Sequence, residues 1–207
     1  MGKHHLEMME YNAAYAMLTC HANTDKLKDE PPSEFLKRAM KVHHDTVLEH
    51  IYLTYEVNNL SRACLQELAR HRHISLSVES TRHTLKKKFE QKDFSVPEHI
   101  PVVSCGDISH LLKDKTQNDV TLDEVLIGFI YTAYIQNPDV PADKLKYFLP
   151  EFWTTNLVMT ANVREMRHII SLRTSPAALK EFQDLARKLV EVVPERFRYL
   201  LEDCVQS

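Results

Sequence analysis

The sequence predicts an α+β fold: a single domain over residues 1–207, with a small antiparallel sheet flanked by helices and a mainly helical C-terminal half. Three observations predict it. The chain has 207 residues, a length that suits one domain. Apolar residues recur at spacings of three and four over several long stretches, as amphipathic helices require. Only a few short runs combine β-branched and aromatic residues in the way typical of strands.

Turn and capping signals divide the N-terminal half into short elements. Ser33, after two prolines, is expected to cap one helix, and Ser61 is expected to cap another that leads into a cationic stretch. In chain order, the expected elements are a helix that begins near 13, a helix over 33–42, a strand over 50–58, a helix that begins at 61 and a strand over 77–85.

The C-terminal half is expected to hold most of the helices. Asp123 and Glu124 suit the acidic first turn of a helix that is apolar on most sides, which predicts a buried helix. Pro150 is expected to stop a short helix before an extended segment. The expected order is a surface excursion over 86–106, helices over 107–115, 121–136 and 142–148, an extended segment over 154–161, helices over 162–173 and 177–192, and a final helix to about 204.

Composition excludes several classes of protein. The 26 basic and 29 acidic residues give a formal charge of −3, so neither nucleic acid nor an anionic membrane is an expected partner. The chain has no apolar run near the ~18 residues of a membrane span and no signal-peptide pattern. We therefore expect a cytoplasmic protein. Its cysteines, which we expect to be reduced thiols, are Cys20, Cys64, Cys105 and Cys204.

A cationic stretch over 70–82 is the first candidate binding site. It contains three arginines, two histidines, four hydroxyls and one carboxylate, and no helical or strand period organises it. Arginine can grip a phosphate or carboxylate through two parallel hydrogen bonds, while hydroxyls fill the remaining acceptor sites. The stretch therefore predicts an anion site, although a charged run of this kind is also typical of a solvated loop.

The segment 162–173 is the second candidate. Its apolar residues fit one buried face of a helix. On the other face, Asn162, Glu165 and His168 repeat at three-residue steps, and Arg164 lies four residues before His168. These groups can address one ligand together, while the alternative is an ordinary solvent-exposed helical face.

Together the two stretches resemble a known family. Arg70-His71-Arg72, followed after seven residues by Ser80-x-Arg82, resembles the signature of the flavin-dependent (alternative) thymidylate synthases. The resemblance covers 43–84 and 142–174. The chain departs from the family at Ser77-Val78, where Asn-Glu is usual, at Glu67, often Gln, at His83, usually Tyr, and at Lys146, where an arginine reaches the substrate phosphate.

The resemblance implies a role for each matching residue. Arg173 is implied as the catalytic residue, because its counterpart holds and polarises the uracil. The residues implied to bind the substrate dUMP are Glu67, Arg70, Ser80, Thr81, Arg82, Lys146 and Arg173. The residues implied to bind FAD are His44, Thr46, Arg70, His71, Arg72, His73, Asn162, Arg164 and His168. No metal ligand is implied.

The activity implied by the resemblance is reductive methylation of dUMP to dTMP. Methylenetetrahydrofolate supplies the carbon, NADPH the electrons, and FAD carries the hydride, so no cysteine nucleophile is needed. The implied assembly is a homotetramer whose active sites combine several subunits. Whether Glu79 replaces the carboxylate missing at Val78 stays open, because adjacent side chains in an extended segment point to opposite faces.

Two alternatives come from other function classes. The His43-His44-Asp45 cluster, the His71-x-His73 pair and the total of twelve histidines suggest a metal-dependent nucleotide phosphohydrolase with His and Asp ligands. The second alternative is a protein that binds a nucleotide without catalysing a reaction. A visible spectrum with metal analysis distinguishes these alternatives from a flavoprotein.

Overall fold

The computed structural model describes residues 3–92, 94, 96–97 and 121–206. These residues form two compact units. Unit 1 comprises the described residues within 1–56, 67–77 and 158–207, and unit 2 those within 57–66 and 78–157. Among the described residues, no helix is long and apolar enough to cross a membrane.

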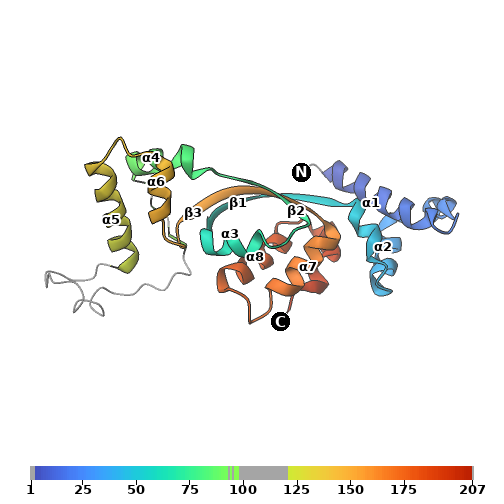
Figure 1. Ribbon diagram of the computed structural model, residues 1–207. Coiled ribbons are helices and arrows are strands. Elements are labelled where there is room, and N and C mark those ends of the chain that lie inside the picture. The colour runs from blue at the N-terminus through green and yellow to red at the C-terminus, as the bar shows by residue number, and fades with distance from the viewer. Residues whose placement is uncertain (1–2, 93, 95, 98–120, 207) are drawn as a thin grey trace. The chain divides into compact units, whose positions relative to one another are not determined.

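A three-stranded antiparallel sheet and a larger set of helices make up the fold, as the sequence predicts (Figure 1). The strands are β1 (Tyr52–Ser61), β2 (Ile74–Val78) and β3 (Thr154–Asn162), in the order β1-β3-β2. The helices are α1 (Lys3–Thr19), α2 (Pro32–Lys41), α3 (Arg62–Leu68), α4 (Thr81–Gln91), α5 (Leu122–Gln136), α6 (Ala142–Leu145), α7 (Val163–Arg173) and α8 (Lys180–Glu191). Shorter 3-10 helices are η1 (Thr24–Lys28), η2 (Asp45–His50), η4 (Lys146–Phe148), η5 (Glu195–Leu200) and η6 (Glu202–Cys204).

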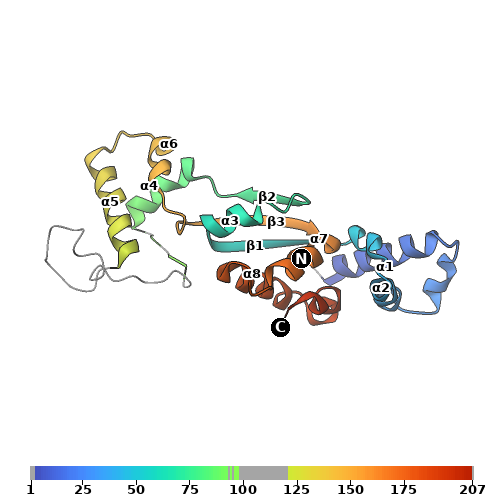
Figure 2. The same cartoon turned by 60° about the horizontal axis from the view of Figure 1, so that its bottom comes forward.

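In unit 1, α1 and α2 lie side by side, and α7 packs against α8 (Figures 1 and 2). The predicted helix over 33–42 is confirmed, but its predicted cap is wrong. Pro31 is the N-cap and Pro32 occupies the first turn, where a missing N–H costs nothing because no intrahelical acceptor faces it. In unit 2, the predicted cap at Ser61 is confirmed, since its Oγ accepts a hydrogen bond from the Cys64 backbone N–H at 3.0 Å.

In unit 2, the prediction of a strand over 77–85 is wrong. β2 ends at Val78, and α4 begins at Thr81 with Ser80 as its N-cap. Leu85 and Phe89, four residues apart, are fully buried in an apolar cluster with Trp153 and Ile130. Burial of this apolar face favours a helix over a strand. The prediction of a surface excursion is therefore also wrong for residues 86–91, which belong to α4.

The long helix α5 begins as predicted but is less buried than predicted. Thr121 and Glu124 form a reciprocal capping box at its N-terminus. Ile127 and Ile130 are buried, whereas Phe129 is 73% exposed and Ile135 57% exposed. The predicted helix over 107–115 lies outside the described residues.

The first helix begins at Lys3, so its predicted start near 13 is wrong. The other predicted elements are confirmed with shifted bounds. β1 and β3 occupy the expected extended segments, α6 with η4 the expected short helix, and α7 and α8 the two amphipathic stretches. The expected final helix consists of the two 3-10 segments η5 and η6.

Candidate functional site

Helix α7 has the two faces that its sequence predicts. Val163, Met166, Ile169 and Ile170 are fully buried. Asn162 caps the helix, since its Oδ1 accepts a hydrogen bond from the Glu165 backbone N–H at 2.8 Å. The other face, with Arg164, Glu165 and His168, is therefore turned away from the core of unit 1.

A cavity of about 490 Å³ lies over this polar face. We name it the α7 cavity; its lining residues are Glu49, His73, Asn162, Arg164, Glu165 and His168. It brings together four of the residues implied to bind FAD: His73, Asn162, Arg164 and His168. Within this lining, the Arg164 Nη1 donates to Glu49 Oε1 at 2.5 Å, so one carboxylate balances the charge of the guanidinium.

Arg173, at the end of α7, is held from three sides. Its Nη1 donates to Glu67 Oε2 at 2.6 Å, and its Nε donates to His71 Nε2 at 3.0 Å. The guanidinium carbon lies 4.6 Å from the centroid of the Phe182 ring, a cation–π contact. The side chain is 16% exposed. The permanently charged guanidinium of Arg173 is thus held in an environment that is largely shielded from water.

His71 is buried beneath Arg173. Its ring lies edge-on to His168 and Phe182, with centroid distances of 5.8 and 6.0 Å. Burial, the Arg173 cation and His168 together lower the pKa of His71 to about 4, so the imidazole is neutral at physiological pH. Its Nδ1 lies 3.5 Å from Glu165 Oε1.

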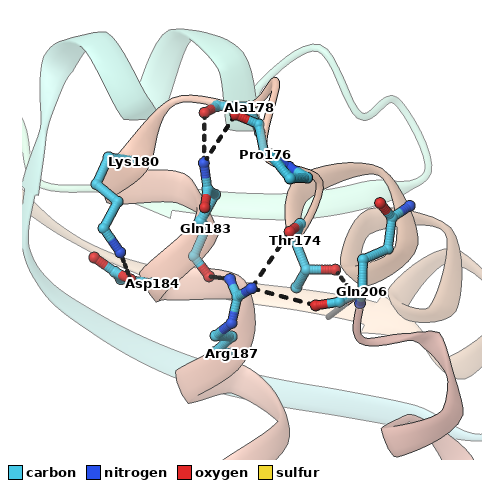
Figure 3. A network of polar contacts seen from close by, with 8 residues as sticks. All are labelled: Thr174, Pro176, Ala178, Lys180, Gln183, Asp184, Arg187 and Gln206. Carbon is cyan, nitrogen blue, oxygen red and sulfur yellow. Dashed lines mark hydrogen bonds and ion pairs between the residues drawn. The ribbon is translucent and has the colours of Figure 1, made fainter.

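The residue after Arg173 is anchored by a polar network (Figure 3). The Thr174 side chain, 1% exposed, accepts from the Gln206 backbone N–H at 2.9 Å and donates to the Ile170 carbonyl at 2.8 Å. Arg187 Nη2 donates to the Thr174 carbonyl at 3.5 Å and to the Gln206 carbonyl at 3.3 Å. The network therefore fixes the C-terminal end of α7 next to Arg173.

Unit 2 has its own cavity, of about 200 Å³, at the N-terminus of α4. We name it the α4 cavity; its lining residues are Arg62, Leu65, Val78, Glu79, Ser80, Thr81, Arg82, Lys146, Trp153 and Thr155. It brings together four residues implied to bind dUMP: Ser80, Thr81, Arg82 and Lys146.

The start of α4 presents donors to this cavity. Ser80 is the N-cap, and its hydroxyl makes no capping hydrogen bond. The first N–H groups of a helix have no intrahelical acceptor, and the helix dipole adds partial positive charge. Arg82 Nε and Lys146 Nζ lie 2.9 and 3.7 Å from Asp143 Oδ1. The arrangement suits a phosphate group.

Glu79 lines the same cavity, and its carboxylate is held by neighbouring side chains. Its Oε2 accepts from Asn156 Nδ2 at 2.8 Å, and its Oε1 lies 3.2 Å from Lys88 Nζ. Burial alone would raise the pKa of Glu79, but hydrogen bonds from Thr84, Lys88 and Asn156 lower it. Val78 and Glu79 both line the cavity because the chain leaves β2 between them and turns into α4.

The sequence assigned no binding role to some residues of these two cavity linings. Arg62 lines the α4 cavity, and its buried Nε has no hydrogen-bond partner among the described residues. An arginine in the first turn of a helix gives no sequence signal that separates it from a solvated side chain. Glu165 was signalled by its three-residue step between Asn162 and His168, but the resemblance gave it no role.

Some implied residues lie outside both cavity linings. Arg70 and Arg72 follow α3 and are exposed. His44 is the residue before η2, and Thr46 is exposed within it. Among the described residues, no group of three His, Cys, Asp or Glu side chains is placed to hold a metal ion, so the phosphohydrolase alternative finds no ligand set there.

Comparisons with known proteins agree on one family. Residues 4–197 match the model of the family described as thymidylate synthase complementing protein. A flavin-dependent thymidylate synthase of Helicobacter pylori is 35% identical over 163 residues, covering 79% of this chain and 77% of that protein. One of Campylobacter jejuni is 33% identical over 201 residues, covering 94% and 92%. The crystal structure of H. pylori thymidylate synthase X with FAD and dUMP aligns with a TM-score of 0.74 and 30% identity, covering 96% of this chain and 95% of that one.

Proposed function

The chain belongs to the thymidylate synthase complementing protein family, that of the flavin-dependent thymidylate synthases, and from this premise we propose that it converts dUMP to dTMP by reductive methylation. When bound, FAD supplies the hydride that completes the methyl group, with methylenetetrahydrofolate as carbon donor and NADPH as reductant. The observation that carries the proposal is the family match over residues 4–197, a range that includes every residue of both cavities.

We propose that the α4 cavity binds the phosphate of dUMP. Ser80, the N–H groups of Thr81 and Arg82, and the cations of Arg82 and Lys146 would contact the phosphate oxygens. Each charge-assisted hydrogen bond contributes about 1.5–3 kcal/mol, so three or four account for a micromolar affinity. The unpartnered Nε of Arg62 supports a further contact from the same wall.

We propose that the α7 cavity binds part of FAD. The donor set fits a polar, anionic portion of that molecule. Arg164 supplies a cation, His73 and His168 supply imidazoles, and the amide nitrogen of Asn162 is available because its oxygen caps α7. A cavity of about 490 Å³ lies within the usual range for ligands of this size class.

Arg173 is the proposed catalytic residue. The reaction places negative charge on the pyrimidine ring, and a fixed guanidinium stabilises that charge without reorganising at the moment of reaction. Glu67 would orient the guanidinium through the hydrogen bond at 2.6 Å, and two of the five guanidinium N–H groups remain for the substrate.

The proposal also covers the oligomeric state and the cellular location of the protein. We propose a homotetramer in which each active site draws residues from several subunits, and exposed Arg70 and Arg72, with His44 and Thr46, are the candidates to complete such a shared site. Residues 1–207 would act as one synthase domain, which the extent of the family match supports. The proposed location is the cytoplasm.

The decisive experiment combines a spectrum with an assay. Purified protein should absorb at about 450 nm, as bound flavin does, and should form dTMP from dUMP only when methylenetetrahydrofolate and NADPH are both present. A colourless protein that refuses FAD and retains stoichiometric zinc or manganese would contradict the proposal and favour a hydrolase.

A further inference from the structure

Glu165 is a largely buried carboxylate in the lining of the α7 cavity, and the proposed reaction has so far given it no role. Its side chain is 11% exposed. Its backbone is fixed, because the Glu165 N–H donates to the cap of α7. Among the described residues, its charged oxygen meets one ionisable partner, the Nδ1 of His71 at 3.5 Å. Burial of a carboxylate is costly, so a side chain kept in this state needs an explanation.

The hydrogen bond from Arg173 shows which tautomer His71 adopts. The Arg173 Nε always carries a proton and donates it to His71 Nε2 at 3.0 Å. The Nε2 atom must therefore present its lone pair, and in a neutral imidazole the single ring proton then resides on Nδ1. The Glu165 Oε1 lies 3.5 Å from that Nδ1 atom. The lowered pKa of His71 agrees with the neutral state.

Four side chains follow one another in contact. Glu165 lies beside His71, His71 accepts a hydrogen bond from Arg173, and Arg173 donates another to Glu67. Glu165 and Arg173 are eight residues apart on α7, about two turns, so they lie on neighbouring faces of the same helix. His71 comes from the segment after α3 and joins them. His71 is 6% exposed, and its ring is packed against Phe182, so it has little freedom to turn.

We propose that Glu165 is a positioning residue: it holds His71 in the tautomer that accepts from Arg173, and thereby fixes the guanidinium in its working position. The proposal rests on the proposed function only for what Arg173 does to its substrate. Without the carboxylate, the ring can carry its proton on Nε2, which then faces the Arg173 Nε–H donor to donor. Arg173 would lose one of its supports while Glu67 and Phe182 remain.

The test begins with Glu165→Gln, which removes the charge and keeps the shape. We expect kcat for dTMP formation to fall about tenfold while the dUMP dissociation constant, measured by equilibrium dialysis, changes by less than about twofold. The matched control is Glu10→Gln in the same unit. Glu10 is 1% exposed and bonds Tyr199 and Arg196, so its loss should lower Tm but leave kcat nearly unchanged.

A double-mutant cycle tests whether Glu165 acts through His71. His71→Gln retains an acceptor for Arg173 but has no tautomer to select. In that background, Glu165→Gln should cause less than about twofold further loss. A tenfold loss in both backgrounds would overturn the proposal, and so would an unchanged kcat in Glu165→Gln when the wild type forms dTMP.

A readout independent of turnover separates this proposal from the proposed function. The rate at which phenylglyoxal modifies Arg173, followed by peptide mass mapping, should rise about fivefold in Glu165→Gln and equally in His71→Gln, but not in Glu10→Gln. If the wild type forms no dTMP, the proposed function fails, and the labelling rates alone decide whether Glu165 positions Arg173. Equal labelling in the wild type and Glu165→Gln would refute that role.

Discussion

Asp143 lies against Arg82 in unit 2, with its Oδ1 atom 2.9 Å from the Arg82 Nε. The same oxygen is 3.7 Å from Lys146 Nζ. The carboxylate thus sits beside the two cations that we propose for the substrate phosphate, and an entering phosphate must compete with it.

Asp143→Asn should therefore tighten dUMP binding. Exposed ion pairs of this kind contribute about 0.2–1 kcal/mol, so we expect the dissociation constant to fall about two- to fivefold. Isothermal titration calorimetry measures it. Asp139→Asn, a nearby exposed change, is the control and should have no effect. Weaker binding by Asp143→Asn would show that the carboxylate supports the phosphate site.

Lys146 and Arg173 should affect different kinetic constants. Lys146→Ala removes a phosphate contact, so we expect the KM for dUMP to rise about tenfold with kcat little changed. Arg173→Ala removes the cation that meets developing charge, so kcat should fall at least about 100-fold. Lys146→Arg should preserve binding, because it restores the charge and adds a fork. Equal effects on both constants in both alanine variants would show that these roles are wrongly divided.

Burial of neutral His71 should make stability depend on pH. Its pKa is about 4 in the folded protein and about 6.5 when unfolded, so between these values the unfolded chain binds more protons. The stabilisation is complete above about pH 6.5 and is lost as the pH falls toward 4. Urea unfolding at pH 4.5 and 7.5 should show a loss in the wild type about 1–3 kcal/mol larger than in His71→Gln. Identical losses would mean that His71 does not titrate as its burial indicates.

Thr174 and Lys180, two residues of the network in Figure 3, should contribute unequally to the free energy of unfolding. Thr174→Val leaves the partly buried Gln206 N–H without its acceptor, so we expect a loss of about 0.5–1.5 kcal/mol in the free energy of unfolding. Lys180→Ala removes an ion pair with Asp184 whose lysine is 64% exposed, and should cost less than about 0.5 kcal/mol. Chemical denaturation measures both, and a larger loss from Lys180→Ala would contradict this ranking.

No cysteine should be needed for turnover. Cys64 is fully buried on α3, Cys20 is exposed, and burial raises the pKa of Cys204 to about 11. None of these three lines either cavity, and Cys105 lies outside the described residues. Replacement of all four by Ala or Ser should keep NADPH-dependent dTMP formation within about tenfold, with a packing cost of about 1–3 kcal/mol at Cys64. A folded Cys64→Ala protein that holds FAD and yet cannot turn over would instead indicate covalent catalysis.

Local patterns predicted the elements that local forces determine. The apolar spacing from Val163 to Ile170 gave the buried face of α7, and Ser61 was recognised as a cap, because both depend on residues three or four positions apart. The order of Arg70, His71, Arg72, Ser80 and Arg82 carried the family, which the comparisons confirm. None of this needed the folded chain.

Tertiary packing decided what the local pattern left ambiguous. By its sequence, the segment 77–85 is compatible with a strand or a helix. Leu85 and Phe89 are buried with Trp153 only when the chain is helical from Thr81 onward. This helix, α4, places Ser80 at its N-terminus. Arg173 and His71 are 102 positions apart, and Arg82 and Asp143 are also distant in sequence. Contacts between such residues form only when the backbone brings them together, because a side chain's spacing in sequence determines its neighbours within a helix or strand and no further.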